Sequence, residues 1–436
     1  MLNTAAKHLS RALTSRLVHR TAKLGLGPTY LRPSILERSP PSRFLHDGIS
    51  GSTGNHVSVS LQMINYAFSH ARSHKSDDSY GESMLVLEQC LGQAHDNDDS
   101  KALVFMAMST LLSERGNYDD AIEKLKGVQD LSLSSIGVRV AAMEALVGLH
   151  LELGQDDSSK VLADKCLEIL GQNELESSGE GGEIIRARAK AVKGLVELVH
   201  GNIQSAESFF IVPGDNKGLT GSATLSYGEF LHSTHNFSLA KELYQNVVQQ
   251  LSEKKDFSNP DSLAACNMSQ EEVLLAATCA LGQLEAQLGN FGDAEDILTR
   301  ALTKAEEDFG SYHPKVGVVL TSIALMFRRK ATQERSSSLL IQEGLYRRAL
   351  ELLKAPPLDT EGAEAKVARS DIIALARGGY AEVLCVQQNR KDQGQEMKSW
   401  AEAAWRNRRL SLAEALAISE ESSKTLVIDT RISRAL

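Results

Sequence analysis

The sequence has few cysteines and no pairing pattern among them. Only five occur in 436 residues, at widely spaced positions, and no CxxC motif is present. An odd number of dispersed cysteines is atypical of a disulfide framework or a zinc module, and fits free thiols in a reducing compartment.

Aromatic residues and long apolar runs are scarce as well. Aromatics make up 5% of the chain, yet hydrophobic residues reach 42%, with Leu, Ala, Ser and Glu predominating. This composition favours helices over strands. The longest apolar stretch, 273–282, has ten residues, well short of the roughly 20 that a membrane-spanning helix needs. We therefore expect no membrane span.

Negative charge predominates, but it is unevenly distributed. The net charge is −9, and residues 46–299 hold 17 Lys and Arg against 37 Asp and Glu. An acidic body repels phosphate backbones, which disfavours general nucleic-acid binding. Local basic clusters such as 328–330 could still bind RNA. The alternative function is therefore that of an organellar helical-repeat RNA-binding protein.

Residues 1–45 differ sharply from the rest. They are rich in Arg, Ser and Leu and contain a single acid, Glu37. As a helix, Leu2, Leu9 and Leu13 would share one face, with Arg11 on the opposite face. The segment resembles a mitochondrial presequence. We predict that 1–45 has no fixed structure, that it is cleaved, and that the mature chain resides in the mitochondrial matrix. The chloroplast is the alternative because of the serine content.

A short pattern recurs along the remaining chain. It reads GNYDDAIEKL at 116–125, GNIQSAESFF at 201–210, HNFSLAKELY at 235–244 and GNFGDAEDIL at 289–298. A Gly-Asn pair suits the turn that ends a helix. In the last three copies a glycine stands twelve residues before the alanine, giving the pairs Gly194/Ala206, Gly228/Ala240 and Gly282/Ala294.

The paired small residues predict how two helices pack. Glycine inside a helix costs about 1 kcal/mol relative to alanine, so its recurrence implies a packing benefit. We expect each glycine to face its alanine where two antiparallel helices cross. Because one such hairpin cannot bury its apolar faces alone, neighbouring hairpins must stack.

The pattern resembles the tetratricopeptide (TPR) family, whose 34-residue period separates Ala206 from Ala240. The stretch 300–327, with Gly310, His313 and Pro314, looks like the variety in kinesin light chains. The resemblance implies an all-α, right-handed α-solenoid of stacked antiparallel helix hairpins, with about seven or eight irregular repeats. We expect this array over 46–420 and a C-terminal tail over 421–436.

First helices of a TPR array line a concave groove that binds other proteins. The resemblance therefore implies a non-enzymatic scaffold or adaptor with other proteins as partners, among them mitochondrial chaperones or complex-assembly factors. The chain is similar to plant mitochondrial proteins with irregular TPR arrays. This resemblance implies that it supports respiratory or cofactor-bearing complexes. Matching to the family places seven residues in the groove: Arg188, Glu229, His232, Gln283, Gln287, Arg328 and Arg329.

Few motifs argue for catalysis or a metal. Two ExxH pairs, Glu197–His200 and Glu229–His232, have the spacing found in di-iron bundles. Parallel first helices would hold the pairs at different depths, so we expect no convergence. His70–His74 lacks a third ligand nearby. We accordingly expect no cofactor, no metal and no catalytic residues, and an enzyme with a di-iron site remains only as the third hypothesis.

Overall fold

The structure is a computed structural model that describes residues 52–94, 97–172, 180–210, 221–253, 263–359, 367–418 and 424–436. The predicted presequence, 1–45, lies outside these residues. Within them the fold is all-α: seventeen α-helices are present, and the only strands form one short hairpin.

Sixteen of the helices pack as eight consecutive pairs within the described residues. The pairs are α2 (Ser52–His74) with α3 (Asp77–Gln93), α4 (Asp98–Glu114) with α5 (Tyr118–Gln129), α6 (Ile136–Glu152) with α7 (Asp156–Gln172), α8 (Glu180–Val199) with α9 (Ile203–Phe210), α10 (Ser222–Ser233) with α11 (Phe237–Glu253), α12 (Gln270–Gln287) with α13 (Phe291–Phe309), α14 (Pro314–Gln333) with α15 (Leu339–Leu352), and α16 (Ser370–Cys385) with α17 (Lys391–Ala404). The described residues also contain three short helical elements: the 3-10 helices η3 (Cys266–Met268) and η4 (Gln388–Arg390), and α18 (Leu412–Leu416).

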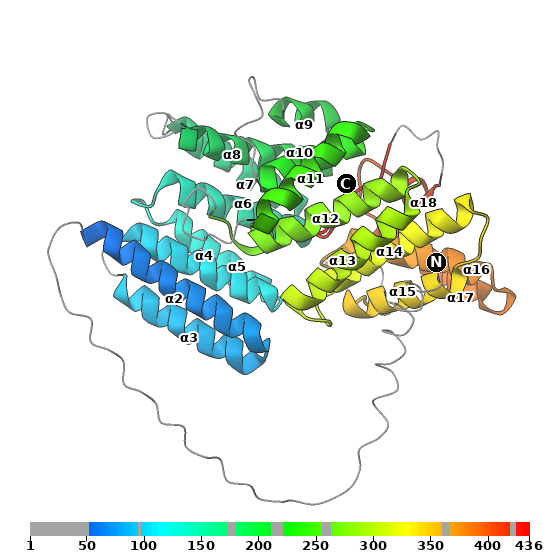
Figure 1. Cartoon of the computed structure of the whole chain (residues 1–436), viewed down its shortest axis with the longest axis horizontal. Coiled ribbons are helices and arrows are strands. Elements are labelled where there is room, and N and C mark those ends of the chain that lie inside the picture. Colours follow the sequence, from blue (N-terminus) through cyan, green and yellow to red (C-terminus); the bar gives the residue numbers. More distant parts are fainter. Residues whose placement is uncertain are drawn as a thin grey trace, which may run out of the picture. The chain divides into compact units, whose positions relative to one another are not determined.

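Successive pairs stack on one another, so the helices form a solenoid (Figure 1). The second helix of each pair also contacts the first helix of the next, in the same arrangement along the array. Packed apolar side chains run continuously from α2 to α12 and α13. This confirms the predicted all-α solenoid of stacked hairpins.

The Gly-Asn turns end the first helices as expected. Gly116 and Gly289 both have φ of +81°, a conformation that is nearly free for glycine. The N–H of the following Asn117 donates to the carbonyl of Leu112, and that of Asn290 to Glu285, each at 2.9 Å. These are the six-to-one bonds of a Schellman motif. In the third copy His235 replaces the glycine, with φ of +67°.

The glycines at the helix crossings face a different residue from the one predicted. A Cβ on Gly194 would lie 2.7 Å from Phe210, and one on Gly228 would lie 2.8 Å from Tyr244. The nearest side chain to Gly282 is Leu298. Each contact is one helical turn beyond the alanine, so the glycine admits a large side chain. The alanines Ala206, Ala240 and Ala294 are themselves fully buried.

The turn before α14 is formed by Gly310, His313 and Pro314. Gly310 ends α13 with φ of +94°. His313 caps α14 through its side chain, and Pro314 is the first residue of that helix, where its missing N–H has no cost. No helix in the described part of the chain has the length and apolarity to cross a membrane.

Candidate functional site

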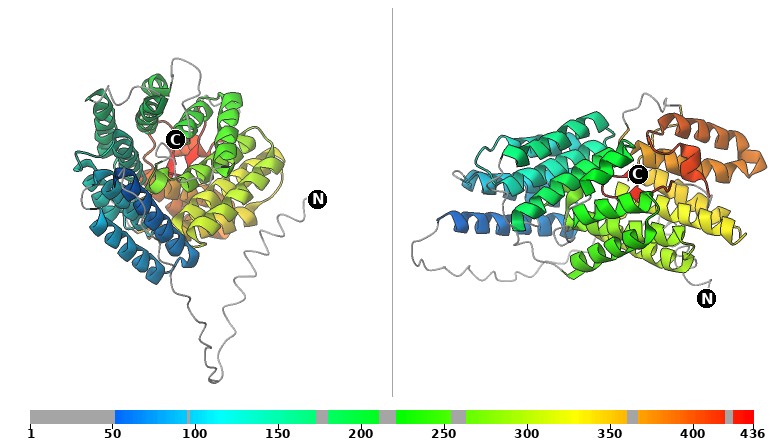
Figure 2. Two further views of the ribbon diagram at one scale, coloured as in Figure 1. Left: turned by 60° about the vertical axis from the view of Figure 1, so that its left-hand side comes forward. Right: turned by 90° about the horizontal axis from the view of Figure 1, so that it is seen from above.

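The inner face of the solenoid holds residues 424–436. This stretch, predicted as a tail, forms a two-stranded antiparallel hairpin of β1 (Ile428–Asp429) and β2 (Arg434–Ala435), with Ile428 opposite Ala435. Every residue from 427 to 436 is buried. Figure 2 shows the segment, in red, surrounded by the helices of the array. The hairpin is therefore an interior element.

Arg431 joins this hairpin to α10. Its guanidinium donates to Glu229 Oε2 at 2.7 Å, to Asp429 Oδ2 at 2.9 Å, and to Ser222 Oγ at 2.7 Å. The side chains of Arg431, Glu229 and Asp429 are all fully buried. Burial and the neighbouring Asp429 raise the pKa of Glu229 well above its usual range, against the attraction of Arg431. One guanidinium thus donates hydrogen bonds to two carboxyl groups.

Arg434 joins the hairpin to α16 and α7. Its Nε lies 2.7 Å from Asp371 Oδ2, and its Nη1 lies 2.7 Å from Asp156 Oδ1 and 2.9 Å from the carbonyl oxygen of Leu151. Burial alone would raise the pKa of Asp156, but the hydrogen bond and charge of Arg434 lower it. Both carboxyl groups are thereby held near a cation inside the solenoid.

Lys315 of α14 forms a third buried cluster. Its Nζ donates to the carbonyl oxygens of Thr430, at 2.9 Å, and of Arg431. The same ammonium lies 3.3 Å from Glu272 and 3.8 Å from Glu152. Burial raises the pKa of Glu272 to about 8; Lys315 opposes this rise, and Glu152 adds to it. Glu152 has a second cation, Arg369, at 3.0 Å.

Side chains of α12 and of the segment after α17 form hydrogen bonds with the main chain of the hairpin. Gln283 of α12 accepts from the N–H of Ile428 at 2.8 Å and donates to its carbonyl oxygen at 3.0 Å. Asn407 donates to the carbonyl oxygen of Ala435 at 2.6 Å, and Arg409 donates to those of Thr425 and Leu436. Contacts of this kind hold an extended polypeptide largely irrespective of its side chains.

The seven predicted groove residues are placed in three different environments. Glu229 contacts the hairpin through Arg431, and Gln283 contacts it through Ile428. Arg188 is buried and pairs with Glu144 and with the carbonyl oxygen of Leu263. His232 is buried between helices, 3.3 Å from the hydroxyl of Tyr244, and burial lowers its pKa to about 3.

The remaining three, Gln287, Arg328 and Arg329, line a small cavity of about 80 Å³ beside Thr425 and Leu426. Arg328 already pairs with Glu382 at 2.6 Å and donates to the carbonyl oxygen of Leu416. Burial and the adjacent Arg328 lower the pKa of Arg329. A direct role of these residues in binding a partner stays a prediction.

The two ExxH pairs do not form a joint site. Glu197 pairs with Lys193 at 2.9 Å and accepts from Asn202, while Glu229 pairs with Arg431. In the described part of the chain, no three His, Cys, Asp or Glu side chains converge in the way a metal ion requires.

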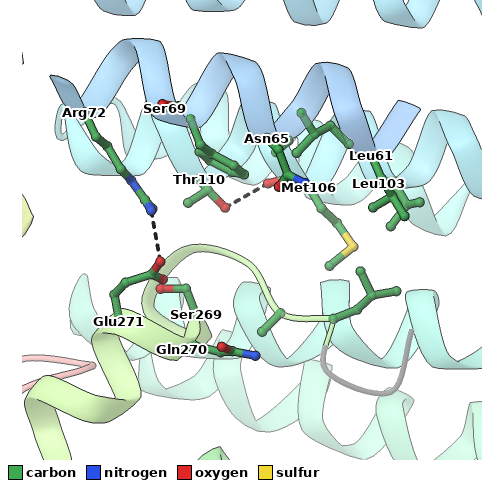
Figure 3. Close-up of a pocket in the computed structure, with 15 residues that line it drawn as sticks. Leu61, Asn65, Ser69, Arg72, Leu103, Met106, Thr110, Ser269, Gln270 and Glu271 are labelled. Atoms are coloured by element: carbon green, nitrogen blue, oxygen red, sulfur yellow. Dashed lines mark hydrogen bonds and ion pairs between the residues drawn. The ribbon is translucent and has the colours of Figure 1, made fainter. Parts of the chain in front are cut away.

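A larger cavity, of about 500 Å³, remains open on the first helices at the other end of the array. It lies between α2, α4 and the stretch 263–271, as Figure 3 shows. η3 packs against α4, α6 and α12, so this stretch crosses the inner face. We call this cavity the α2–α4 cleft.

Sequence reasoning missed the hairpin residues Asp429, Arg431 and Arg434. One available signal was an acid inside an apolar first helix, Glu229 of α10, because a buried carboxylate requires a cation. Arg431 and Arg434 were basic residues for which no acidic partner had been inferred. The pairing itself joins distant residues, 202 positions apart for Arg431 with Glu229 and 278 for Arg434 with Asp156, which local sequence cannot reveal.

No family model matches the chain, and no curated protein matches it.

Proposed function

We propose that this chain is a non-enzymatic protein-binding scaffold or adaptor of the mitochondrial matrix. It would support the assembly or maintenance of respiratory or cofactor-bearing machinery, for example iron–sulfur proteins. The observation that carries the proposal is that the inner face of the array binds an extended polypeptide, residues 424–436. Gln283, Lys315 and Arg409 form hydrogen bonds with its main chain.

The architecture supports binding over catalysis. The buried acids and bases of the groove already neutralise one another, as Arg434 does with Asp371 and Asp156. An open apolar cavity with a few polar groups at its edge is a common form of binding site, and the α2–α4 cleft has this form. A scaffold needs such a surface and no reactive centre.

We propose further that the array belongs to the TPR family. The Schellman turns at Gly116 and Gly289 and the capped start of α14 at His313 support this assignment. The basic, acid-poor composition of residues 1–45 supports import into mitochondria.

The RNA-binding alternative has weaker support. Within the basic cluster at 328–330, Arg328 pairs with Glu382 and Lys330 pairs with Glu295 at 3.2 Å. Paired cations offer less attraction to phosphate than free ones.

The test is affinity purification of the mature protein from isolated mitochondria at moderate salt, with and without nuclease. The proposal predicts specific protein partners that resist nuclease treatment. Recovery of RNA with partners that nuclease removes would contradict it, as would iron bound in stoichiometric amounts.

A further inference from the structure

The α2–α4 cleft is lined by side chains of α2 and α4 on one side and of the 263–271 stretch on the other. On α2, Leu61, Phe68 and Arg72 line it, spaced by about two turns and then one turn. On α4, Leu103, Met106 and Ala107 stand at positions i, i+3 and i+4. Leu61 to Arg72 spans about 16 Å of helix at about 1.5 Å per residue. A helix of three turns has a matching length, and it would pack its side chains between those of α2 and α4.

The floor of the cleft is apolar and its rim is polar. Leu103 and Met106 are buried, while Leu61, Phe68 and Leu263 are half-exposed. Asn65 and Ser69 are exposed at the rim, and Figure 3 shows Gln270 and Glu271 across the cavity from α2. Methionine in the floor adapts to side chains of different shape. This distribution suits an amphipathic ligand with one apolar face.

The single arginine of the cleft is fully engaged by two acids. Arg72 donates through Nη2 to Glu114 at 2.7 Å, through Nε to the same carboxylate at 3.1 Å, and through Nη1 to Glu271 at 3.0 Å. One cation with two carboxylates leaves this edge net negative. An anionic head group would therefore meet repulsion here.

The two hairpins that supply α2 and α4 are acidic as well. Residues 52–130, which include the first two hairpins, carry six Lys and Arg against twelve Asp and Glu. Electrostatic complementarity then favours a basic partner, because opposite charge steers encounter and selects among ligands.

We infer that the α2–α4 cleft is the docking surface for a basic amphipathic helix of a partner protein. The helix lays apolar side chains on Leu61, Phe68 and Met106 and presents Lys or Arg toward Glu271 at the edge of the cleft. This inference rests on the proposed scaffold function and names the surface and the partner chemistry.

The test uses a synthetic 14-residue helix labelled with a fluorophore, carrying Leu at i, i+3, i+4 and i+7 and Lys or Arg at the positions that border the leucine face. Anisotropy titration against the mature chain should give saturable binding that weakens as salt rises. A peptide with the same leucines and Glu in place of the basic residues should bind at least tenfold more weakly. Equal binding of the two peptides would overturn the inference.

Two variants locate the binding. Leu61→Lys puts a positive charge at a half-exposed position of the cleft, and Ala264→Trp fills its mouth from the 263–271 stretch; each should weaken binding at least tenfold. Leu85→Lys, at an exposed position of α3 outside the cleft, is the matched control and should leave binding unchanged. Thermal unfolding of each variant verifies that it is folded, and equal loss in all three would overturn the inference.

Other occupants give different results. Binding of decanoate that the basic peptide cannot displace would mark a lipid site, and self-association lost in Leu61→Lys would mark a second copy; either overturns the inference. Partners purified from mitochondria equally well with wild type and Leu61→Lys would overturn the cleft while leaving the scaffold function intact. Peptide binding that depends on the cleft, in a protein that recovers no mitochondrial protein partner, would support the cleft and contradict the scaffold function.

Discussion

Arg431 and Glu229 lie 202 residues apart in the sequence, yet Nη2 of the arginine is 2.7 Å from Oε2 of the glutamate. Neither side chain is exposed to solvent. The contact ties the 424–436 hairpin to α10 on the inner face of the solenoid. A groove expected to be free for partners is thus filled, over this part, by the chain itself.

The first prediction concerns this buried pair. Arg431→Leu leaves Glu229 and Asp429 buried without their cation, and loss of one partner of a buried ion pair costs about 3–5 kcal/mol. Urea unfolding should show a loss of this size. The control is Arg348→Leu, which breaks a pair with the largely exposed Glu351; such surface pairs contribute about 0–1 kcal/mol. Equal effects of the two changes would contradict the buried cluster.

The second prediction concerns the pH dependence of stability. The pKa of Glu272 is about 8 in the folded protein, against an ordinary 4.5, because burial and Glu152 outweigh Lys315. Between these values the folded state keeps a proton that the unfolded state has released. The contribution of Glu272 to stability therefore falls as pH rises from about 5 to about 8, by at most about 1.4 kcal/mol per pH unit.

Glu272→Gln removes this titration. The free energy of unfolding of the variant, relative to wild type, should increase between pH 6 and pH 8.5 in urea titrations. Glu396→Gln, at an exposed position of α17, should show no such trend. A constant difference between Glu272→Gln and wild type across this range would show that Glu272 does not titrate there.

The third prediction concerns the helix crossings. A Cβ at Gly228 would lie 2.8 Å from the rigid ring of buried Tyr244, so Gly228→Ala should destabilise the protein by about 1–3 kcal/mol through overpacking. Gly81, on α3, has no neighbour within 4 Å of the same atom. Gly81→Ala should instead stabilise by up to about 1 kcal/mol, since alanine favours helix. Thermal unfolding with the same sign for both would refute this role of the crossing glycines.

The fourth prediction concerns the thiols. All five cysteines are free, and only Cys385 is partly exposed. Burial raises the pKa of Cys266 and of Cys279 to about 12, which suppresses the reactive thiolate. A disulfide reagent should modify no more than Cys385 rapidly in the folded protein and all five after unfolding in urea. Rapid reaction of Cys279 in the folded state would disagree with its position in the core.

The hairpin array could be predicted because its signals are local. The Gly-Asn turns at Gly116 and Gly289 and the His313–Pro314 cap each specify a helix boundary through backbone geometry alone. The crossing glycines were identified, but their partner was assigned one turn too early, since the large side chains at Phe210 and Tyr244 carried no sign of their direction.

The filled groove could not be predicted in the same way. Residues 424–436 include several apolar residues, but the segment is short and no local pattern pairs its two arginines with particular acids. Only the acids brought together by distant helices make Arg431 and Arg434 interior residues. The α2–α4 cleft was missed for a related reason. One wall is the 263–271 stretch, which meets α4 across a long separation in sequence: Cys266 and Thr110 are 156 positions apart.

Hydrogen exchange measured by mass spectrometry, with and without a saturating basic amphipathic peptide, tests the central claim most directly. We predict slower exchange in α2, in α4 and in the 263–271 stretch, with no change in residues 424–436. Faster exchange in 424–436 together with protection of α10 to α14 would mean that ligands displace the hairpin and enter the groove behind it, and this result would contradict docking in the α2–α4 cleft.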